Sequence, residues 1–520
     1  MPIAKQWLVG TSLSVTGILQ PVAHLSEKSS GEGASQSFAA DSLAMGMLVM
    51  LAMTIIQRGV GFFRGIWICR MLDDSVVGQW AMALGFILLI TPVMMLGIPG
   101  SLPRYTEHFR LRGHLKAFVR RLAMLTAGFT ALFFVAVAFV PSKLAWFIFL
   151  EPQDTQLVYC VAAAVGAISA FYFVNELLSG LRQVRVVSLM QFVQSLSFTA
   201  IALAVLYGGY GLHAVILSFA VATSIALIPG LWVLCRGWSG VPVSEEPFKA
   251  PSMWRRLLPF AAALWAVNLL GNVFDLSDRY MILHFTPGGE VIGQAAVGQY
   301  HSGRIVPVLL ISLGMLISGV LMPYLSADWE NGNRQAVRDR MRRVLLAMSA
   351  VFTLGGAFSL LIAPWMFGTL LQGRYNDGLT LMPMAFVFCT WAAMVIVANG
   401  YLLVIEKGKL VALATGIGLT ANIVLNALLL PVWGLHGAVV STLCSHGIVM
   451  LGVWVAMSRT DFRFDRTLLY VSMMPATLLA GPWVAAASVL ICMAASEHAR
   501  EWTREAIDLV LAKRQQRSLA

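Results

Sequence analysis

Long apolar segments separated by short, charged loops run through almost the whole chain, and no other feature constrains the fold as much. A bilayer needs roughly 20 apolar residues per spanning helix. About thirteen such segments lie at residues 42–69, 79–102, 120–140, 157–181, 186–207, 211–235, 257–284, 297–324, 342–363, 379–404, 410–430, 435–457 and 467–495. Because lipid cannot satisfy the open edge of a sheet, and the segments lack the alternation of a barrel, the sequence predicts an all-α polytopic membrane bundle.

The composition excludes several other classes of protein. Only 12% of the residues are charged and the mean hydropathy is +0.77, whereas a soluble globular protein has about 25% charged residues. Such a composition excludes a soluble enzyme, a disordered chain and a fibrous repeat. The net charge of +11 does not require a nucleic-acid partner, because Lys and Arg normally collect in the cytoplasmic loops of membrane proteins. The six cysteines occur singly, without a C-x-x-C pair, so neither a disulfide frame nor a metal site is expected.

The distribution of charge among the loops predicts the orientation. Loops that follow even-numbered segments hold roughly ten times as many Lys and Arg residues as loops that follow odd-numbered ones. The positive-inside rule therefore places the N-terminus and the even loops in the cytoplasm, and the protein in the inner membrane. The last apolar segment, 467–495, is interrupted by Pro475 and by Gly481-Pro482. It is either one span or a re-entrant hairpin, so the side of the tail at 496–520 stays open.

The chain also contains an internal repeat. Residues 77–80 (Val-Gly-Gln-Trp) recur as 297–300 (Val-Gly-Gln-Tyr), and Pro103 recurs as Pro323, both after 220 residues (298 − 78 and 323 − 103). The repeated unit holds six spans, an even number, so both halves enter the membrane from the same side and the repeat is parallel. The expected parts are a disordered cytoplasmic arm at 1–40, a six-helix lobe at 41–235, a cytoplasmic loop at 236–256, a second six-helix lobe at 257–457, and a hydrophobic appendage with a charged tail at 458–520.

A few ionisable residues lie inside the predicted spans, where they usually face a cavity. Arg58, Arg64 and Arg304 are expected in the outer half of the bundle, where arginine can form paired bonds to phosphate oxygens. They are the predicted substrate-binding residues. Arg58 and Arg64 point about 120° apart on one helix, so they suit a wide cavity rather than a narrow pocket. The seventh span adds three charged residues that either line the cavity or act as structural charge partners, namely Asp275, Asp278 and Arg279.

Two groups of residues resemble a known family. The segment 58–64 (Arg-Gly-Val-Gly-Phe-Phe-Arg), followed by 69–72 and 77–80, resembles the opening of polysaccharide-precursor flippases. The segment 278–282 with Arg304 looks like the start of that family's second lobe. These flippases belong to the multidrug/oligosaccharidyl-lipid/polysaccharide (MOP) exporter superfamily. The resemblance implies a V-shaped bundle of two lobes, alternating access, and transfer of undecaprenyl-diphosphate-linked sugars between leaflets, with the arginines in the central cavity.

The sequence therefore predicts a flippase for a lipid-linked oligosaccharide or exopolysaccharide precursor. The chain has no P-loop, no G-x-S-x-G and no metal-ligand cluster, so neither an enzyme nor a cofactor is expected. The expected partners are the lipid-linked sugar, membrane lipids, and the polymerase and export machinery of the polysaccharide. Three alternatives remain: a cation-coupled multidrug exporter of the same fold, a membrane polymerase or glycosyltransferase, and a structural partner in a secretion complex.

Overall fold

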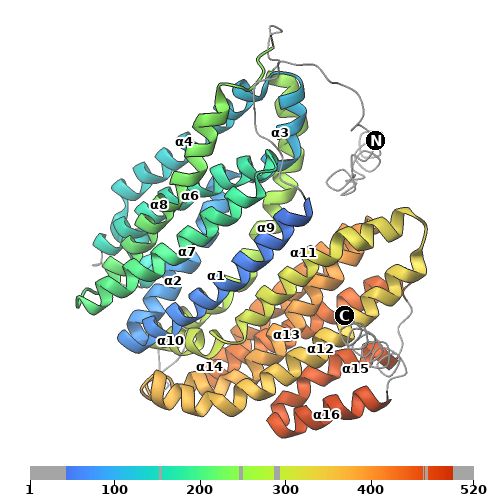
Figure 1. The fold of residues 1–520 in the computed structure, drawn as a ribbon. Coiled ribbons are helices and arrows are strands. Elements are labelled where there is room, and N and C mark those ends of the chain that lie inside the picture. The colour runs from blue at the N-terminus through green and yellow to red at the C-terminus, as the bar shows by residue number, and fades with distance from the viewer. Residues whose placement is uncertain are drawn as a thin grey trace, which may run out of the picture. The chain divides into compact units, whose positions relative to one another are not determined.

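The described part of the chain consists of helices joined by short turns, without a strand (Figure 1). The computed structural model describes residues 43–150, 155–244, 250–285, 293–460, 462 and 466–495. The predicted all-α class is therefore confirmed. The predicted arm at 1–40 and the tail at 496–520 lie outside the described residues.

Contacts between helices divide the chain into two compact units, with the division after His301. The first unit contains α1 (Leu43–Met71), α2 (Asp74–Met95), η2 (Pro99–Ser101), α3 (Leu102–Leu111), α4 (Leu115–Phe139), α5 (Pro141–Phe149), α6 (Thr155–Gly180), α7 (Val184–Tyr207), α8 (Leu212–Trp238), α9 (Ala250–Phe285) and most of α10 (Gly293–Arg304). The second unit contains the end of α10, α11 (Val308–Glu330), α12 (Arg334–Trp365), η3 (Met366–Leu370), α13 (Asn376–Val404), α14 (Gly408–Ser458), α15 (Arg466–Ala476), η4 (Thr477–Ala480) and α16 (Pro482–Ala495).

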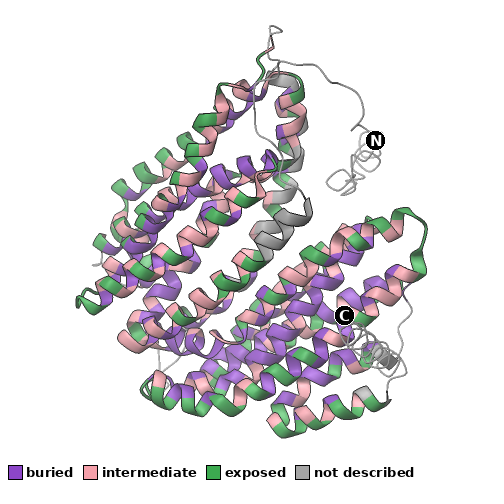
Figure 2. Ribbon diagram, in the orientation of Figure 1, coloured by how far each residue is buried: buried purple, intermediate pink, exposed green. Residues whose placement is uncertain are grey.

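The helices have the length and polarity of a polytopic membrane protein. Among the described residues, nine helices are long and apolar enough to cross a bilayer, and shorter apolar helices follow at 468–480 and 482–492. In the first unit α6 is the most deeply buried of these helices, and in the second unit it is α13, which packs against α11, α12 and α14 (Figure 2). By contrast α4 exposes most of its apolar side chains, as expected for a helix that faces lipid. The polytopic bundle is confirmed, while the count of thirteen spans and the limits of the two lobes remain predictions.

Two of the predicted spans are interrupted. The expected span at 79–102 ends as α2 at Met95, where Leu96 and Gly97 take left-handed angles (φ 48° and 68°), and η2 follows from Pro99. The expected span at 297–324 is broken after Arg304, and α11 begins next to Pro307. Proline has no backbone N–H and clashes with the preceding turn, so a helix ends or restarts there.

In the first unit, the two copies of the Val-Gly-Gln motif pack against each other. A Cβ atom on Gly78 of α2 would overlap the carbonyl group of Gln294, and one on Gly298 of α10 would overlap the carbonyl group of Asp74. Gly298 follows Gly78 by 220 residues, and Gln294 follows Asp74 by the same interval (298 − 78 and 294 − 74). Exchanging the two copies of the repeat therefore turns one of these contacts into the other, as expected for residues related by a two-fold axis. The side chain of Gln299 also donates to the Asp74 carboxylate at 3.1 Å.

In the second unit, α14 is a pair of helices rather than one. Gly434 interrupts it with non-helical angles (φ 53°, ψ −134°). The two halves then pack together, because a Cβ atom on Gly418 would overlap Val449 and one on Gly452 would lie 3.1 Å from Ala414. The two runs predicted at 410–430 and 435–457 are thus separate helices that meet at a glycine.

The last apolar run forms two short helices rather than the single span counted above. Gly481, with φ 111°, separates α15 and η4 from α16, which has 14 residues and is about 21 Å long. Ser349 of α12 donates to the carbonyl oxygen of Val471 at 2.8 Å and so ties the hairpin to the second unit. Within the hairpin, Thr477 pairs with Ser488 at 2.9 Å. Since a span needs roughly 30 Å of helix, the structure favours the re-entrant alternative.

The hairpin predicts a topology that labelling can check. In a variant without native cysteines, we expect single cysteines at Thr460 and Ala494 to react with a membrane-impermeant maleimide from the same side. A cysteine at Arg374, on the turn before α13, should react from the opposite side. If Ala494→Cys reacts from the side of Arg374→Cys, the last run crosses the membrane once and the hairpin is wrong.

The reciprocal glycine contact predicts equal sensitivity at two distant positions. We expect Gly78→Ala and Gly298→Ala each to destabilise the protein by about 1–3 kcal/mol, because the added methyl group must displace a helix backbone. Thermal unfolding in detergent measures the effect. Gly128→Ala and Gly355→Ala are matched controls, since a Cβ atom there meets open space and alanine favours a helix by about 1 kcal/mol. Stability unchanged at Gly78 and Gly298 would contradict the close contact.

Candidate functional site

Arg64 of α1 lies against α7 in the first unit. Its Nη1 atom donates to Oγ1 of Thr199 at 3.1 Å and to the carbonyl oxygen of Ser195 at 3.3 Å. Its guanidinium carbon is 4.4 Å from the centroid of the Phe198 ring. The three α7 residues are spaced by three and four, so they share one face of that helix and present it to α1.

The described partners of Arg64 are neutral, so they leave its charge uncompensated. No described acidic side chain forms an ion pair with Arg64. The edge of the guanidinium formed by Nε and Nη2 donates to no described residue, and this edge is the one that binds a phosphate or carboxylate in paired bonds. Gly61, one turn earlier, leaves room beside it: a Cβ atom there would lie 3.6 Å from Nη2. The site is thus a half-buried cation with donors available to an anionic ligand.

Arg58 has different surroundings on the same helix. Its side chain is exposed, and no described residue forms a hydrogen bond or an ion pair with it. The contrast with Arg64 fits the angular difference of about 120° expected from a six-residue step. A role of Arg58 in substrate binding stays a prediction.

Arg304 belongs to the second unit and ends α10. It is buried, and its guanidinium carbon lies 5.4 Å from the centroid of the Phe388 ring of α13. The neighbouring Gly303 allows close packing, since a Cβ atom there would overlap the carbonyl group of Gly378. The ring of His446, in α14, lies 5.5 Å from the same Phe388 ring. Arg304 is therefore held at an aromatic side chain, as Arg64 is in the first unit.

The charged residues of α9 connect helices of the first unit. Asp278 is buried and accepts a hydrogen bond from the hydroxyl group of Tyr300 at 2.8 Å. Arg279 donates from Nη1 to the carbonyl oxygen of Ala81 at 3.1 Å, which ties α9 to α2. These contacts join helices, and the choice between a cavity role and a charge-partner role for Asp278 and Arg279 stays a prediction. The side chain of Asp275 lies outside the described residues.

Sequence reasoning missed the polar residues of α7 that face the same region. We call Gln191, Gln194, Ser195 and Thr199 the α7 polar face. They recur at intervals of three and four in a helix that is mostly apolar. That period was the available signal, because polar residues at such spacing share one side of a helix.

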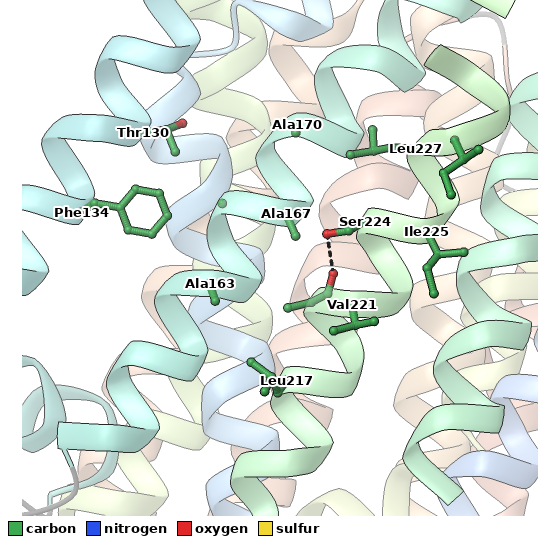
Figure 3. Close-up of a pocket in the computed structure, with 13 residues that line it drawn as sticks. Thr130, Phe134, Ala163, Ala167, Ala170, Leu217, Val221, Ser224, Ile225 and Leu227 are labelled. Carbon is green, nitrogen blue, oxygen red and sulfur yellow. Dashed lines mark hydrogen bonds between the residues drawn. The ribbon is translucent and has the colours of Figure 1, made fainter. Parts of the chain in front are cut away.

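The first unit also contains an apolar pocket of about 780 Å³ (Figure 3). Its walls come from α4, α6 and α8, with small residues such as Ala163 and Ala167 beside the Phe134 ring. The hydroxyl group of Ser224 donates to the carbonyl oxygen of Ala220 at 2.9 Å, within its own helix. None of the described residues that line the pocket is charged, so it suits hydrocarbon rather than a phosphate group.

Comparisons with known proteins agree with this fold. The lipid II flippase MurJ, in an inward closed conformation, matches with a TM-score of 0.66 and 12% identity, over 89% of this chain and 100% of that one. An inward-facing multidrug resistance MATE family transporter of the MOP superfamily matches with a TM-score of 0.60 and 14% identity, over 84% and 99%. A MOP superfamily transporter from Pyrococcus furiosus matches with a TM-score of 0.57 and 13% identity, over 84% and 95%. No curated protein matches the chain.

At these identities the solved structures establish the fold alone, which is that of MOP superfamily transporters. The sequence itself matches one family over residues 43–329, more than half of its length, and that family is described as polysaccharide biosynthesis protein. The chain therefore belongs to the polysaccharide biosynthesis protein family.

Proposed function

We propose that this protein is a flippase that moves a polyprenyl-diphosphate-linked oligosaccharide or exopolysaccharide precursor across the inner membrane. The observation that carries the proposal is the state of Arg64, a cation inside a helical bundle with neutral partners and a free Nε–Nη2 edge among the described residues. A diphosphate supplies the negative charge and the oxygen spacing that such an edge binds. Membership of the polysaccharide biosynthesis family supports a sugar-bearing substrate.

The proposal includes the finer features predicted from the sequence. Of the about thirteen apolar segments, twelve would form two parallel six-helix lobes with the N-terminus in the cytoplasm, and the last would be the re-entrant hairpin. Arg58 and Arg304 would contact the substrate as well as Arg64. The partners would be the lipid-linked sugar, membrane lipids, and the machinery that polymerises and exports the polysaccharide.

Transport of this kind needs no covalent step. The protein would alternate between two states, and the substrate would shift their equilibrium only by as much as its affinities for them differ. Arg64 can contribute to that difference, because its bonds to Thr199 and Ser195 compete with bonds to a ligand. No group of three His, Cys, Asp or Glu residues in the described ranges is placed to hold a metal ion, and the proposed mechanism uses none.

If Arg64 and Arg304 bind the substrate, replacing either one should reduce export without reducing the amount of inserted protein. We expect Arg64→Ala and Arg304→Ala each to reduce export of the surface glycan roughly ten- to hundred-fold, since a hydrogen bond to a charged group contributes about 1.5–3 kcal/mol. Arg64→Lys should retain part of the export, because it keeps the charge but lacks the paired donors. Glycan at the cell surface, divided by the amount of inserted protein, is the measurement.

The matched control is Arg334→Ala, because Arg334 is exposed and stacks on Trp329 at the start of α12. This variant should export normally. Normal export in both Arg64→Ala and Arg304→Ala would refute the phosphate-site hypothesis.

A second measurement separates the flippase from a cation-coupled drug exporter. An exporter of cationic drugs needs acidic groups at its binding site, whereas an uncompensated Arg64 repels cations. We therefore expect that producing the protein does not reduce accumulation of a lipophilic cation such as ethidium in cells. Reduced accumulation that persists in Arg64→Ala would favour the exporter instead.

A further inference from the structure

The α7 polar face extends from Arg64 along the interior of the first unit. Gln191 donates from Nε2 to Oδ1 of Asn175, in α6, at 3.3 Å. Gln194 donates from Nε2 to Oγ1 of Thr223, in α8, at 2.9 Å. From Gln191 to Thr199, which accepts the bond from Arg64, the face covers eight residues, or about 12 Å of helix.

The two glutamine side chains can form more hydrogen bonds than they make with the described residues. An amide group offers two donors and two acceptor lone pairs. In the described part of the chain, Gln191 and Gln194 each make a single side-chain hydrogen bond, and both remain partly exposed. Groups of this kind are unfavourable next to lipid, so their concentration on one face indicates a polar ligand or water along it.

The chemistry of the face selects one class of ligand. Its side chains are neutral amides and hydroxyls, and the cation Arg64 stands at one end. Neutral groups that both donate and accept hydrogen bonds suit the hydroxyl groups of a sugar, while a second anion or an apolar tail would gain little from them. The arrangement thus matches a molecule with a charged group next to a hydroxylated neutral part.

We propose that the α7 polar face binds the sugar residues nearest the diphosphate of the transported lipid, with Gln191 and Gln194 as the recognition residues. The inference rests on the proposed function, since it assigns the diphosphate to Arg64. It adds a separate site that determines which sugars are accepted. The contacts to Asn175 and Thr223 hold the two amides in place and are exchanged in part for bonds to sugar hydroxyls.

Binding of two lipids to the purified full-length protein tests this inference. The probes are undecaprenyl diphosphate, which has no sugar, and the lipid-linked oligosaccharide extracted from source cells that lack the gene. We expect the double variant Gln191→Leu/Gln194→Leu to bind the sugar-bearing lipid at least tenfold more weakly than the unchanged protein. Its affinity for undecaprenyl diphosphate should stay within twofold. Arg64→Ala should weaken the binding of both lipids.

Control variants separate recognition from structural effects. Ser197→Ala removes a hydroxyl group from the side of α7 opposite the polar face, because the two residues between Ser195 and Ser197 turn the helix by about 200°, and it should bind both lipids normally. Gln191→Asn keeps the amide group, so with Gln194 unchanged it should retain most of the affinity for the sugar-bearing lipid. Unfolding temperature and a single elution peak show that each variant is folded.

The outcomes are distinguishable. If the glutamine double variant loses affinity equally for both lipids, or for neither, the proposed sugar site is wrong, because the amides then serve packing only. If the unchanged protein binds neither lipid, the proposed function itself fails. If the double variant loses the sugar-bearing lipid alone while Arg64→Ala binds both normally, the sugar site stands and the phosphate site is wrong.

Discussion

Hydrocarbon supplies neither hydrogen-bond donors nor acceptors, and this constraint determines most of what the chain can do. Backbone groups in the spans must be satisfied within helices, and many hydroxyl groups also donate to a carbonyl oxygen of their own helix. Thr91, Ser218 and Thr390 each donate to the carbonyl oxygen four residues earlier in their own helices. Departures from helix are therefore confined to short turns, several of them at a glycine such as Gly434. These interruptions shape the bundle, because the regular helices between them have little freedom.

The same constraint makes a charged side chain informative. An arginine in a span would be unfavourable without partners, and Arg64 obtains them from α7: two acceptors for one nitrogen, and the face of Phe198. The contacts stabilise the side chain without neutralising it. An aspartate in place of Thr199 would have cancelled the charge. Neutral partners instead hold the positive charge at a fixed place, and the low dielectric constant around it strengthens its potential. Binding of an anionic lipid headgroup requires such a potential.

Local sequence signals account for the fold better than for the site. Hydropathy locates the helices, and Gly434 and Gly481 mark turns that the sequence shows by residue type alone. The paired motifs reveal the repeat, but not that Gly78 and Gly298 pack on each other's segments, since periodicity carries no information about contact. The partners of Arg64 are more than 130 residues away in the chain, so no local pattern could name them. The α7 polar face could have been predicted from the spacing of its residues, but its direction toward α1, α6 and α8 depends on tertiary packing.

The repeat also explains why the proposed binding residues need not occur in pairs. Near the landmark glycines the two copies differ by 220 residues, so the counterpart of Arg64 is His284 (64 + 220) and that of Arg304 is Leu84 (304 − 220). The backbone contact at Gly78 and Gly298 obeys the two-fold relation, whereas the cations do not. A symmetric scaffold lets two halves close on each other with matched surfaces. A ligand with a charged end and a sugar end is not symmetric, and the side chains that bind it have to differ between the halves. When duplicated helices bind one polar, elongated molecule, we therefore expect the two copies to keep the same backbone geometry but to differ in their charged side chains.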